Sequence, residues 1–304
     1  MEFIRCPNCD SSLDLKVTKR IGPNIVEGGL ACGECGKSYA IRKGIPRFVE
    51  SDAYVRSFSA EWNVFSKTQL DVEGRLGSRD TFTEKTGVKP SDLSGYNILE
   101  AGCGMGRFLD VVSEAPRSNV VGFDLSLSVE AAYENLARRS NVCILQADLM
   151  KPPFGKESFD FVYSIGVLHH TSDPKRAFME LVPLVKAGGQ IAIWVYHTYR
   201  WPPLSDFYRI ATKRMPWSMV LAISKLLSSS YSISRKLRYL RVLFPISDAS
   251  DPQLRILDTF DWYSPRYQFK FTITEVISWF KEAGLTDIEV LSVPISIRAR
   301  RPRR

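Results

Sequence analysis

The fold is decided by one stretch, Asn97-Ile98-Leu99-Glu100-Ala101-Gly102-Cys103-Gly104-Met105-Gly106-Arg107-Phe108. A short apolar run ends in an acidic residue, three glycines follow at alternate positions, and a segment with apolar residues at helical spacing comes next. This order predicts a strand, a tight turn and a helix, because glycine fits where the backbone takes a positive φ or comes close to a ligand. Open α/β sheets bind nucleotides at such a turn, beyond the carboxyl end of a strand.

The spacing of the three glycines narrows the choice of ligand. A dinucleotide-binding turn has the pattern G-x-G-x-x-G, whereas this turn has G-x-G-x-G and places Arg107 at the last position of that pattern. The phosphate-binding pattern G-x-x-x-x-G-K-[ST] does not occur in the sequence. We therefore expect a ligand with an adenosine half and no phosphate. The alternative interpretation is an ordinary glycine turn.

Length and composition set wider limits. The chain has 304 residues, enough for one large or two unequal domains, and 44% of them are hydrophobic, so it can bury a substantial core. The net charge of +8 is compatible with nucleic acid or an anionic membrane as a partner. The chain begins without the apolar stretch of a signal peptide, and no apolar run approaches the ~20 residues that span a bilayer. We expect a cytoplasmic protein, whose cysteines serve as metal ligands or buried thiols rather than in disulfides.

Four cysteines form two C-x-x-C pairs near the start of the chain, Cys6 with Cys9 and Cys32 with Cys35. Two such pairs about twenty residues apart are a strong signal of a zinc site. Each pair supplies two thiolates from one tight turn, and four thiolates close a tetrahedron with no open position, as in structural zinc sites. The alternative, a redox-active pair, needs a βαβ context that this part of the sequence lacks.

Residues 1–50 form a small module that ends in Lys37-Ser38-Tyr39-Ala40-Ile41-Arg42-Lys43-Gly44-Ile45-Pro46-Arg47-Phe48. Together with the cysteine pairs, this segment resembles the zinc-ribbon-like module that occurs as a small activator subunit of tRNA and protein methyltransferases. The same module also occurs fused to the front of bacterial methyltransferases. The resemblance implies that the module stabilises the assembly or shapes a substrate surface.

Residues 51–96 link this module to the rest of the chain. Tyr54, Phe58, Trp62 and Phe65 recur at helical spacing, which predicts an amphipathic helix with an aromatic face. This helix either packs on the main domain or forms a lid over the ligand, and we favour packing.

Strands and helices alternate from Asn97 onward. The apolar run 120–123 ends in Asp124, about twenty residues after the glycine turn, where a carboxylate can accept both ribose hydroxyls of an adenosine. The next apolar run ends in Asp148, and the runs 158–165 and 190–196 predict a fourth and a fifth strand. The pattern predicts an α/β fold.

The glycine turn closely resembles the first motif, E/D-x-G-x-G-x-G, of class I S-adenosylmethionine (SAM) methyltransferases. The segments 158–170 and 183–196 resemble the same family, including its small-molecule and wobble-uridine tRNA branches. The resemblance covers residues 97–304 with one interruption, and it implies a Rossmann-like seven-stranded sheet that closes with an antiparallel hairpin. It implies SAM as the cofactor, with Asp148 contacting the adenine amino group. The residues that would hold SAM are Glu100, Gly102, Cys103, Gly104, Gly106, Asp124, Leu125, Asp148, Leu149 and Ile165.

The chain has three histidines, His169, His170 and His197. All three follow the carboxyl ends of predicted strands, at the edge of the sheet that binds ligands. One of them could act as a general base, although a histidine in this motif of the family often only shapes the cofactor pocket.

An insertion at residues 198–258 interrupts the methyltransferase pattern. Its segment 207–247 has no acidic residue and interleaves basic with apolar side chains. We expect it to be helical, apolar on one side and basic on the other. Such a segment can lie on an anionic membrane, dock a phosphate backbone, or form a cap over the active site whose apolar face packs on the domain.

The segment Asp261-Trp262-Tyr263-Ser264-Pro265-Arg266-Tyr267-Gln268 then returns the chain to the domain. It resembles a segment of uncharacterised methyltransferases associated with polysaccharide and secondary-metabolite genes. We expect it to line a substrate pocket, and the alternative is a packed loop. The candidate substrate contacts are Tyr196, Tyr263, Arg266 and Tyr267.

The main functional hypothesis is transfer of a methyl group from SAM to a small-molecule or lipid-linked glycan acceptor, at oxygen. The candidates for a general base are His169, His170, His197 and Asp261. A second hypothesis is methylation of tRNA or rRNA, which the module, the net charge and the basic insertion favour. The N/D-P-P-Y/F motif of enzymes that methylate base amino groups is absent after the fourth predicted strand, where residues 164–167 stand instead. This argues against methylation of base amino groups. A third hypothesis is an inactive methyltransferase-like binding subunit, against which the retained cofactor residues argue.

Overall fold

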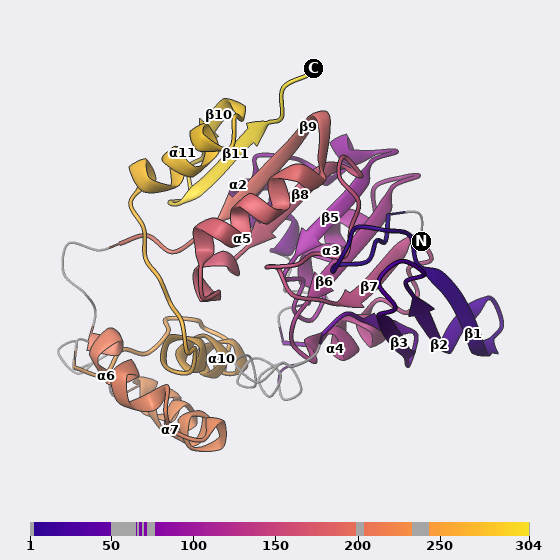
Figure 1. Ribbon diagram of the computed structural model, residues 1–304. Coiled ribbons are helices and arrows are strands. Elements are labelled where there is room, and N and C mark those ends of the chain that lie inside the picture. Colours follow the sequence, from indigo (N-terminus) through magenta and orange to yellow (C-terminus); the bar gives the residue numbers. More distant parts are fainter. Residues whose placement is uncertain are drawn as a thin grey trace.

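The computed structural model describes residues 3–49, 65, 67–68, 70–71, 77–198, 204–232 and 243–303. Within these ranges the strands form one mixed sheet with the order β1-β2-β3-β4-β7-β6-β5-β8-β9-β11-β10 (Figure 1). Helices lie on both faces of the sheet, and a separate group of helices lies beyond the ends of its central strands.

Five parallel strands make up the centre of the sheet. They are β5 (Asn97–Ala101), β6 (Asn119–Asp124), β7 (Val142–Gln146), β8 (Phe159–Ile165) and β9 (Val185–Trp194). Strand β11 (Ser296–Arg300) pairs antiparallel with β9, and β10 (Thr286–Val290) pairs antiparallel with β11. The α/β fold and its closing antiparallel hairpin are therefore confirmed. The strand order reverses between β5 and β8, which is where sheets of this kind bind ligands.

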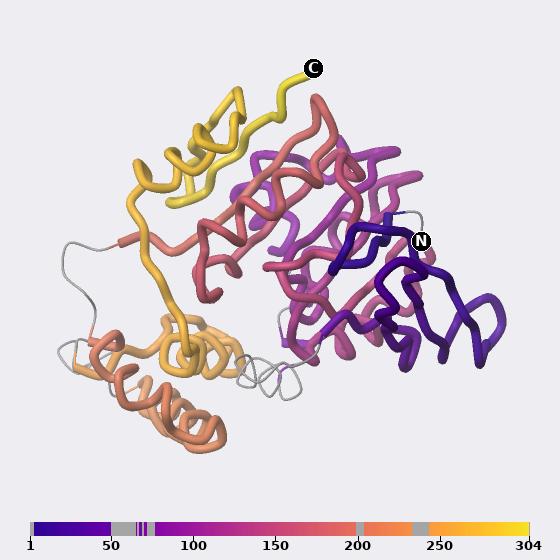
Figure 2. Tube along the Cα trace, in the orientation of Figure 1, coloured from indigo at the N-terminus to yellow at the C-terminus, as the bar shows by residue number. Residues whose placement is uncertain are grey.

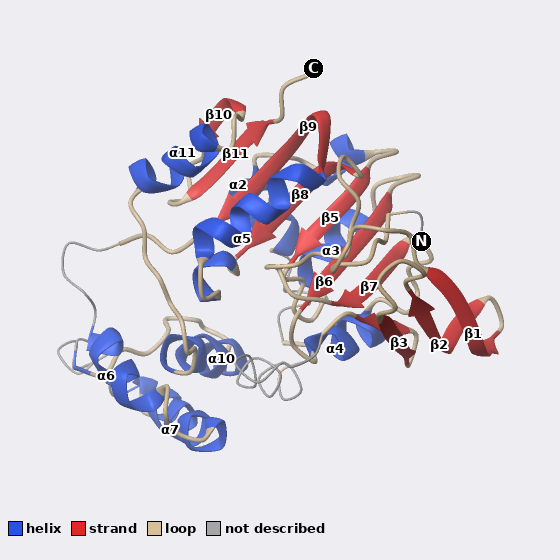
Figure 3. Ribbon diagram, in the orientation of Figure 1, coloured by secondary structure: helices blue, strands red, loops and turns tan. Residues whose placement is uncertain are grey.

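Helices cover the two faces of this sheet (Figure 3). On one face lie α2 (Ser78–Thr86), α3 (Arg107–Ser113) and α4 (Ser128–Asn135), and on the other lie α5 (Pro174–Leu181) and α11 (Ile273–Glu282). Along β8, Phe161 and Tyr163 pack against Phe82 of α2, whereas Val162 belongs to the core under α5. This follows from the alternation of side chains along a strand, and each such burial stabilises the fold by about 1.5–3 kcal/mol.

The N-terminal module adds four antiparallel strands to the edge of the sheet (indigo in Figure 2). They are β1 (Asp14–Ile21), β2 (Asn24–Ala31), β3 (Ser38–Arg42) and β4 (Ile45–Arg47). Strand β4 joins the methyltransferase-like part through a parallel pairing of Arg47 with Gln146 of β7. The expected count of seven strands is therefore wrong for the whole sheet. The seven strands from β5 to β11 are present, and the four strands of the module extend the same sheet beyond β7. Strand β4 thereby covers part of the β7 backbone that would otherwise be exposed at an edge.

The insertion is helical, as expected, and has its own small core. It contains α6 (Leu204–Thr212), α7 (Trp217–Ser229) and α10 (Pro252–Tyr263). Figure 1 shows these helices together beyond the carboxyl ends of β5 and β8. Their core consists of Phe65, Val220, Leu221, Leu257, Phe260 and Tyr263. Asp261 and Tyr263 therefore lie at the end of α10 rather than in a returning loop.

Part of the predicted linker lies outside the described residues, including Tyr54, Phe58 and Trp62. Phe65, the last residue of the predicted aromatic face, is 2% exposed and packs against the insertion helices. No described helix is both long enough and apolar enough to cross a bilayer.

Candidate functional site

The glycine turn lies between β5 and α3, at the carboxyl edge of the sheet. Gly102 and Gly106 have φ angles of +82° and +90°, a region that residues with a Cβ rarely adopt. A Cβ on Gly102 would also lie 2.3 Å from the Val167 side chain. The backbone amides of Gly102 and Cys103 donate to the Phe123 carbonyl at 2.8 and 3.0 Å. These bonds hold the turn against the end of β6.

Asp124 connects this turn to the loop that follows β6. One carboxylate oxygen accepts a hydrogen bond from the Gly104 amide at 3.0 Å, and the other accepts from the amide and the hydroxyl of Ser126 at 2.8 and 2.7 Å. Burial raises the pKa of Asp124 above its usual value, while the Ser126 and Gly104 amides oppose that rise. The carboxylate therefore holds two loops that face the same pocket.

Glu100 lies beneath the turn and is 2% exposed. The Tyr163 hydroxyl donates to its Oε2 at 3.1 Å. Burial raises the pKa of Glu100 well above its usual range, and the nearby Asp124 raises it further. Glu100 thus supplies a polar floor to the pocket.

These groups meet in one pocket of about 150 Å³, called here the glycine-turn pocket. Of the residues predicted to hold the cofactor, it brings together Glu100, Gly102, Cys103, Gly104, Asp124, Leu125, Leu149 and Ile165. Gly106 lies beside it as the N-cap of α3. Asp148 lines a neighbouring cavity instead, although Leu149 next to it reaches the glycine-turn pocket.

The glycine-turn pocket also has lining residues that the sequence analysis missed. They are Met105, Arg107, Phe108, Ser126, Gly166, Val167 and Thr171. Met105, Arg107 and Phe108 could have been predicted, because they belong to the glycine stretch itself. The others lie in loops after β6 and β8, and no pattern in the sequence distinguished them.

The three histidines occupy different environments. His169 is fully buried, both ring nitrogens lack hydrogen bonds to described residues, and its ring stacks on Tyr196 with centroids 3.8 Å apart. His170 lines the glycine-turn pocket, and its Nδ1 lies 2.9 Å from the Tyr267 carbonyl. Burial lowers the pKa of His169 well below its usual range and that of His170 to about 4. His197 lines a separate cavity.

Asp261 reaches the glycine-turn pocket from α10. Its Oδ1 is buried and makes no hydrogen bond within the described part of the chain. Burial, and then the neighbouring Asp258, raise the pKa of Asp261 to about 7. Lys85 interacts with Asp258, and its ammonium lies 3.5 Å from the centre of the Trp194 ring. Burial and Arg107 lower the pKa of Lys85 to about 8.

A second cavity, called here the outer cavity, has a volume of about 490 Å³. It is lined by Trp194, Tyr196, His197, Ser205, Asp206, Pro245, Trp262, Gln268, Lys270 and Pro294. Of the candidate substrate contacts, Tyr196 lies here. Tyr263 is 3% exposed within the core of the insertion, and its hydroxyl donates to the Pro245 carbonyl at 2.9 Å. Arg266 is exposed, with its guanidinium 5.5 Å from the centre of the Tyr267 ring.

The four cysteines of the module come together as the spacing predicts. The Sγ atoms of Cys6, Cys9, Cys32 and Cys35 all lie within 4.8 Å of one another. The closest pairs join the two turns, Cys6 to Cys35 at 3.5 Å and Cys9 to Cys32 at 3.4 Å. The Tyr39 hydroxyl lies 3.4 Å from the Cys6 sulfur. Four sulfurs from two knuckles form a donor set suited to one metal ion.

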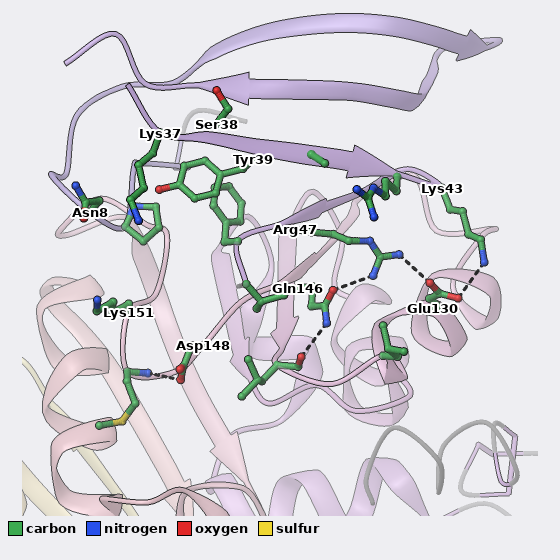
Figure 4. Close-up of a pocket in the computed structure, with 18 residues that line it drawn as sticks. Asn8, Lys37, Ser38, Tyr39, Lys43, Arg47, Glu130, Gln146, Asp148 and Lys151 are labelled. Carbon is green, nitrogen blue, oxygen red and sulfur yellow. Dashed lines mark hydrogen bonds and ion pairs between the residues drawn. The ribbon is translucent and has the colours of Figure 1, made fainter. Parts of the chain in front are cut away.

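A third cavity, of about 880 Å³, lies at the seam between the module and the main sheet (Figure 4). Arg47 crosses this seam and donates to Glu130 of α4 and to Gln146 of β7, each at 2.8 Å. Gln146 in turn donates to the Leu125 carbonyl at 2.9 Å. The module therefore contacts, through two side chains, the loop that lines the glycine-turn pocket.

Comparisons with known protein families agree with this geometry. Residues 99–193 match the family described as a methyltransferase domain, and residues 1–44 match the family described as Trm112p-like protein. The chain carries both domains, which confirms the two resemblances seen in the sequence.

Two curated relatives match part of the chain. An O-methyltransferase of Penicillium expansum is 31% identical over 118 residues, which cover 38% of this chain and 43% of that protein. A tRNA (carboxymethyluridine(34)-5-O)-methyltransferase of Arabidopsis thaliana is 34% identical over 126 residues, covering 38% of this chain and 30% of that protein. The chain thus spans less than half the length of either relative.

A solved structure shares the fold. It is phosphoethanolamine N-methyltransferase 2 of Haemonchus contortus in complex with phosphomonomethylethanolamine and S-adenosylhomocysteine. The similarity has a TM-score of 0.50 at 16% sequence identity and covers 82% of this chain and 48% of that one. The sheet from β5 to β11 therefore has the class I methyltransferase fold.

Proposed function

We propose that this chain, with a methyltransferase domain behind a Trm112p-like domain, transfers a methyl group from SAM to an oxygen of a small molecule or a lipid-linked glycan. The observation that carries the proposal is the meeting of the glycine turn, Asp124 and Asp261 at one pocket. The first two are suited to an adenosine cofactor. A carboxylate with a pKa of about 7 is suited to remove a proton from an acceptor hydroxyl.

The residues of the glycine-turn pocket fit SAM. Gly102 must be a glycine, because its φ is positive and a Cβ would lie 2.3 Å from the Val167 side chain in the pocket wall. Asp124 offers carboxylate oxygens for ribose hydroxyls, and Leu125 and Leu149 offer apolar surface for an adenine ring. When bound, SAM supplies a methyl group on a positively charged sulfur. Catalysis then depends on how the protein positions the acceptor oxygen.

Asp261 is the general base that the geometry favours among the four candidates. Its Oδ1 makes no hydrogen bond to the residues that the structure describes, and its raised pKa suits it to hold a proton taken from the acceptor. His169 is fully buried away from the pocket lining, so we assign it a packing role against Tyr196. His170 is neutral near pH 7 and shapes the pocket wall.

We also propose that Cys6, Cys9, Cys32 and Cys35 hold a structural zinc ion. The close approach of their four sulfurs supports this assignment. Four thiolates fill the tetrahedral shell that zinc prefers and leave no position for a substrate. We propose the division into a module at residues 1–50, a linker at 51–96 and a catalytic domain at 97–304 with an insertion at 198–258.

Methylation of tRNA or rRNA is the second candidate. Two observations favour it, the Trm112p-like domain and the similarity to a tRNA methyltransferase. Contact of the insertion with a membrane surface is a further possibility to test. Phe207, Ile210, Met219 and Leu226 of α6 and α7 are each more than half exposed, whereas several of the predicted basic residues (Arg235, Lys236, Arg238 and Arg241) lie outside the described ranges.

The deciding experiment incubates the protein with methyl-labelled SAM and a total extract of the source cell. The extract is then separated into RNA, protein, organic and small-solute fractions, with Asp124→Ala as the blank. We expect label in the organic or small-solute fraction. Label in RNA that decreases with added salt would instead support an RNA methyltransferase. Failure of the protein to bind SAM would support the inactive binding subunit.

A further inference from the structure

The outer cavity adjoins the glycine-turn pocket at two places. The Gly166 amide, in the wall of the glycine-turn pocket, donates to the Trp194 carbonyl at 3.0 Å. A Cβ on Gly166 would lie 3.3 Å from the Trp194 ring, which lines the outer cavity. Asp261 and Trp262 are consecutive in α10 and face one cavity each. The two cavities therefore share a wall at Gly166 and Trp194, and one segment of α10 contributes a residue to each.

The lining of the outer cavity combines aromatic surface with hydrogen-bonding groups. Trp194, Tyr196 and Trp262 supply the aromatic surface. Asp206, Gln268 and other polar side chains supply donors and acceptors. The volume of about 490 Å³ lies within the range of small-molecule sites, which is about 300–1,000 Å³. Aromatic walls with a few placed polar groups are typical of a site that orients one rigid ligand.

One of these polar groups is incompletely satisfied. Gln268 Oε1 is buried and makes no hydrogen bond to any described residue. A buried acceptor without a partner is costly, and such groups are usually satisfied by a ligand, a water or an ion. A hydroxyl group of a ligand would satisfy this oxygen, because a hydroxyl can donate.

The charges of the cavity favour an uncharged ligand. Its lining has one acidic and one basic side chain, Asp206 and Lys270, and the Lys270 ammonium lies 2.5 Å from Asp206 Oδ2. Arg209 lies 3.8 Å from the other carboxylate oxygen. Both basic groups are thus already paired with the Asp206 carboxylate, whereas a phosphate site usually offers arginine or lysine to the phosphate itself.

We propose that the outer cavity binds the methyl acceptor as an uncharged polyhydroxylated ring, such as a pyranose, stacked on tryptophan with a ring hydroxyl on Gln268. This proposal rests on the methyltransferase function proposed above and names its substrate class. In the reaction, the acceptor oxygen forms a bond to the methyl carbon, and the bond from that carbon to sulfur breaks with its electron pair remaining on sulfur. Asp261 keeps the hydroxyl proton.

The test measures ligand binding by saturation-transfer NMR on the full chain with S-adenosylhomocysteine present. The probes are the methyl glycosides of glucose, galactose, mannose, rhamnose and N-acetylglucosamine, with uridine and uridine monophosphate as competitors. We expect at least one glycoside to bind, and Trp262→Ala and Gln268→Met each to weaken that binding at least tenfold. Gln268→Met keeps the size of the side chain and removes the oxygen. Trp217→Ala, which changes an exposed tryptophan of α7 outside the cavity, is the matched control and should bind normally.

Calorimetry with S-adenosylhomocysteine separates the two proposals. If the unaltered chain does not bind S-adenosylhomocysteine, the proposed function itself is overturned. Normal binding, together with no glycoside signal at millimolar concentration, would overturn the substrate class alone. Uridine or its monophosphate could bind in place of a glycoside, with a dependence on Trp262 and Gln268. That result would overturn the proposed substrate class in favour of a nucleoside acceptor. If Trp217→Ala weakens glycoside binding as much as Trp262→Ala and Gln268→Met do, the outer cavity is not the binding site.

Discussion

The Arg47 guanidinium lies 2.8 Å from the Gln146 side-chain oxygen, across the seam between the N-terminal module and the methyltransferase domain. The Arg47 side chain is 13% exposed, and Gln146 is 3% exposed. The Gln146 amide continues to the Leu125 carbonyl, directly after Asp124. A change in the module can therefore reach the loop that we propose to hold the cofactor.

Replacing Arg47 with methionine should destabilise the protein and weaken SAM binding together. Loss of hydrogen bonds to a charged group costs about 1.5–3 kcal/mol each, and Gln146 would no longer be held from the module side. We expect a lower unfolding temperature and a Kd for SAM raised several-fold, measured by calorimetry. Arg42→Met, an exposed residue of the same cavity, is the control. An unchanged Kd with a lower unfolding temperature would limit Arg47 to holding the module in place.

Gly102→Ala should weaken SAM binding strongly while leaving the protein folded. The alanine Cβ would lie 2.3 Å from the Val167 side chain, at a φ of +82°, and this conformation costs an L-residue about 1–2 kcal/mol. The turn or Val167 would have to shift, and both line the glycine-turn pocket. Equilibrium dialysis with labelled SAM would show a decrease of at least tenfold. Gly77→Ala meets nothing within 4 Å and has no positive φ, so it should bind SAM normally. Normal binding by Gly102→Ala would contradict the assignment of this turn.

The rate of methyl transfer should depend on the ionisation of Asp261. Burial and Asp258 raise the pKa of this carboxyl to about 7, so kcat/KM should rise with pH up to about 7 and then level off. Asp261→Asn should lower kcat by about 10²–10⁴-fold, the usual contribution of a general base, and should remove this pH dependence. Asp287→Asn, at an exposed carboxylate, is the control. A rate that is independent of pH in the unaltered chain would mean that the acceptor needs no base.

The same residue should link stability to pH. The pKa of Asp261 is about 7 in the fold and about 3.9 when unfolded, so the folded chain binds the proton more tightly between these values. Its contribution to the free energy of unfolding is therefore complete below about pH 4 and is lost as the pH rises through 7. Asp261→Asn should gain stability relative to the unaltered chain at pH 8 and little at pH 4, as thermal unfolding at the two values would show. A difference of the opposite sign would contradict the raised pKa.

Cys32→Ser should release the metal and unfold the module. Metal analysis of the native protein should find one zinc per chain, and the variant should contain much less. The loss of a structural site removes folding free energy directly. Cys143→Ser, outside the cluster, should retain zinc. Native protein without stoichiometric metal would remove the zinc assignment, and zinc retained by Cys32→Ser would exclude this ligand.

The sequence predicted those parts of the site that depend on neighbouring residues. The turn around Gly102 follows from local backbone requirements, and Asp124 follows from the regular length of one strand–helix–strand unit. The two cysteine pairs could be assigned in the same way, because each knuckle is a short turn with its ligands at fixed spacing. In each case the chemistry lies within a short segment whose geometry the sequence restricts.

The roles of the more distant residues could not be separated in this way. The sequence grouped His169, His170, His197 and Asp261 as equal candidates. The histidines follow predicted strands at the ligand-binding edge, and Asp261 begins the polar aromatic segment after the insertion. Their difference comes from burial, which leaves His169 enclosed and gives Asp261 a raised pKa. Tyr263 was grouped with the substrate contacts, but one turn of α10 directs it into the core of the insertion.

The sequence by itself determined the methyltransferase-like sheet, the glycine turn and the cysteine cluster, because local backbone preference and hydrophobic periodicity suffice for them. The tertiary structure alone decided that the module extends the sheet beside β7, that Arg47 is linked through Gln146 to the Leu125 loop, and that α10 lines both the glycine-turn pocket and the outer cavity beside Trp194. Each of these depends on the packing of segments more than sixty residues apart in the chain. Such contacts depend on which distant surfaces pack against one another, and a short stretch of sequence does not contain that information.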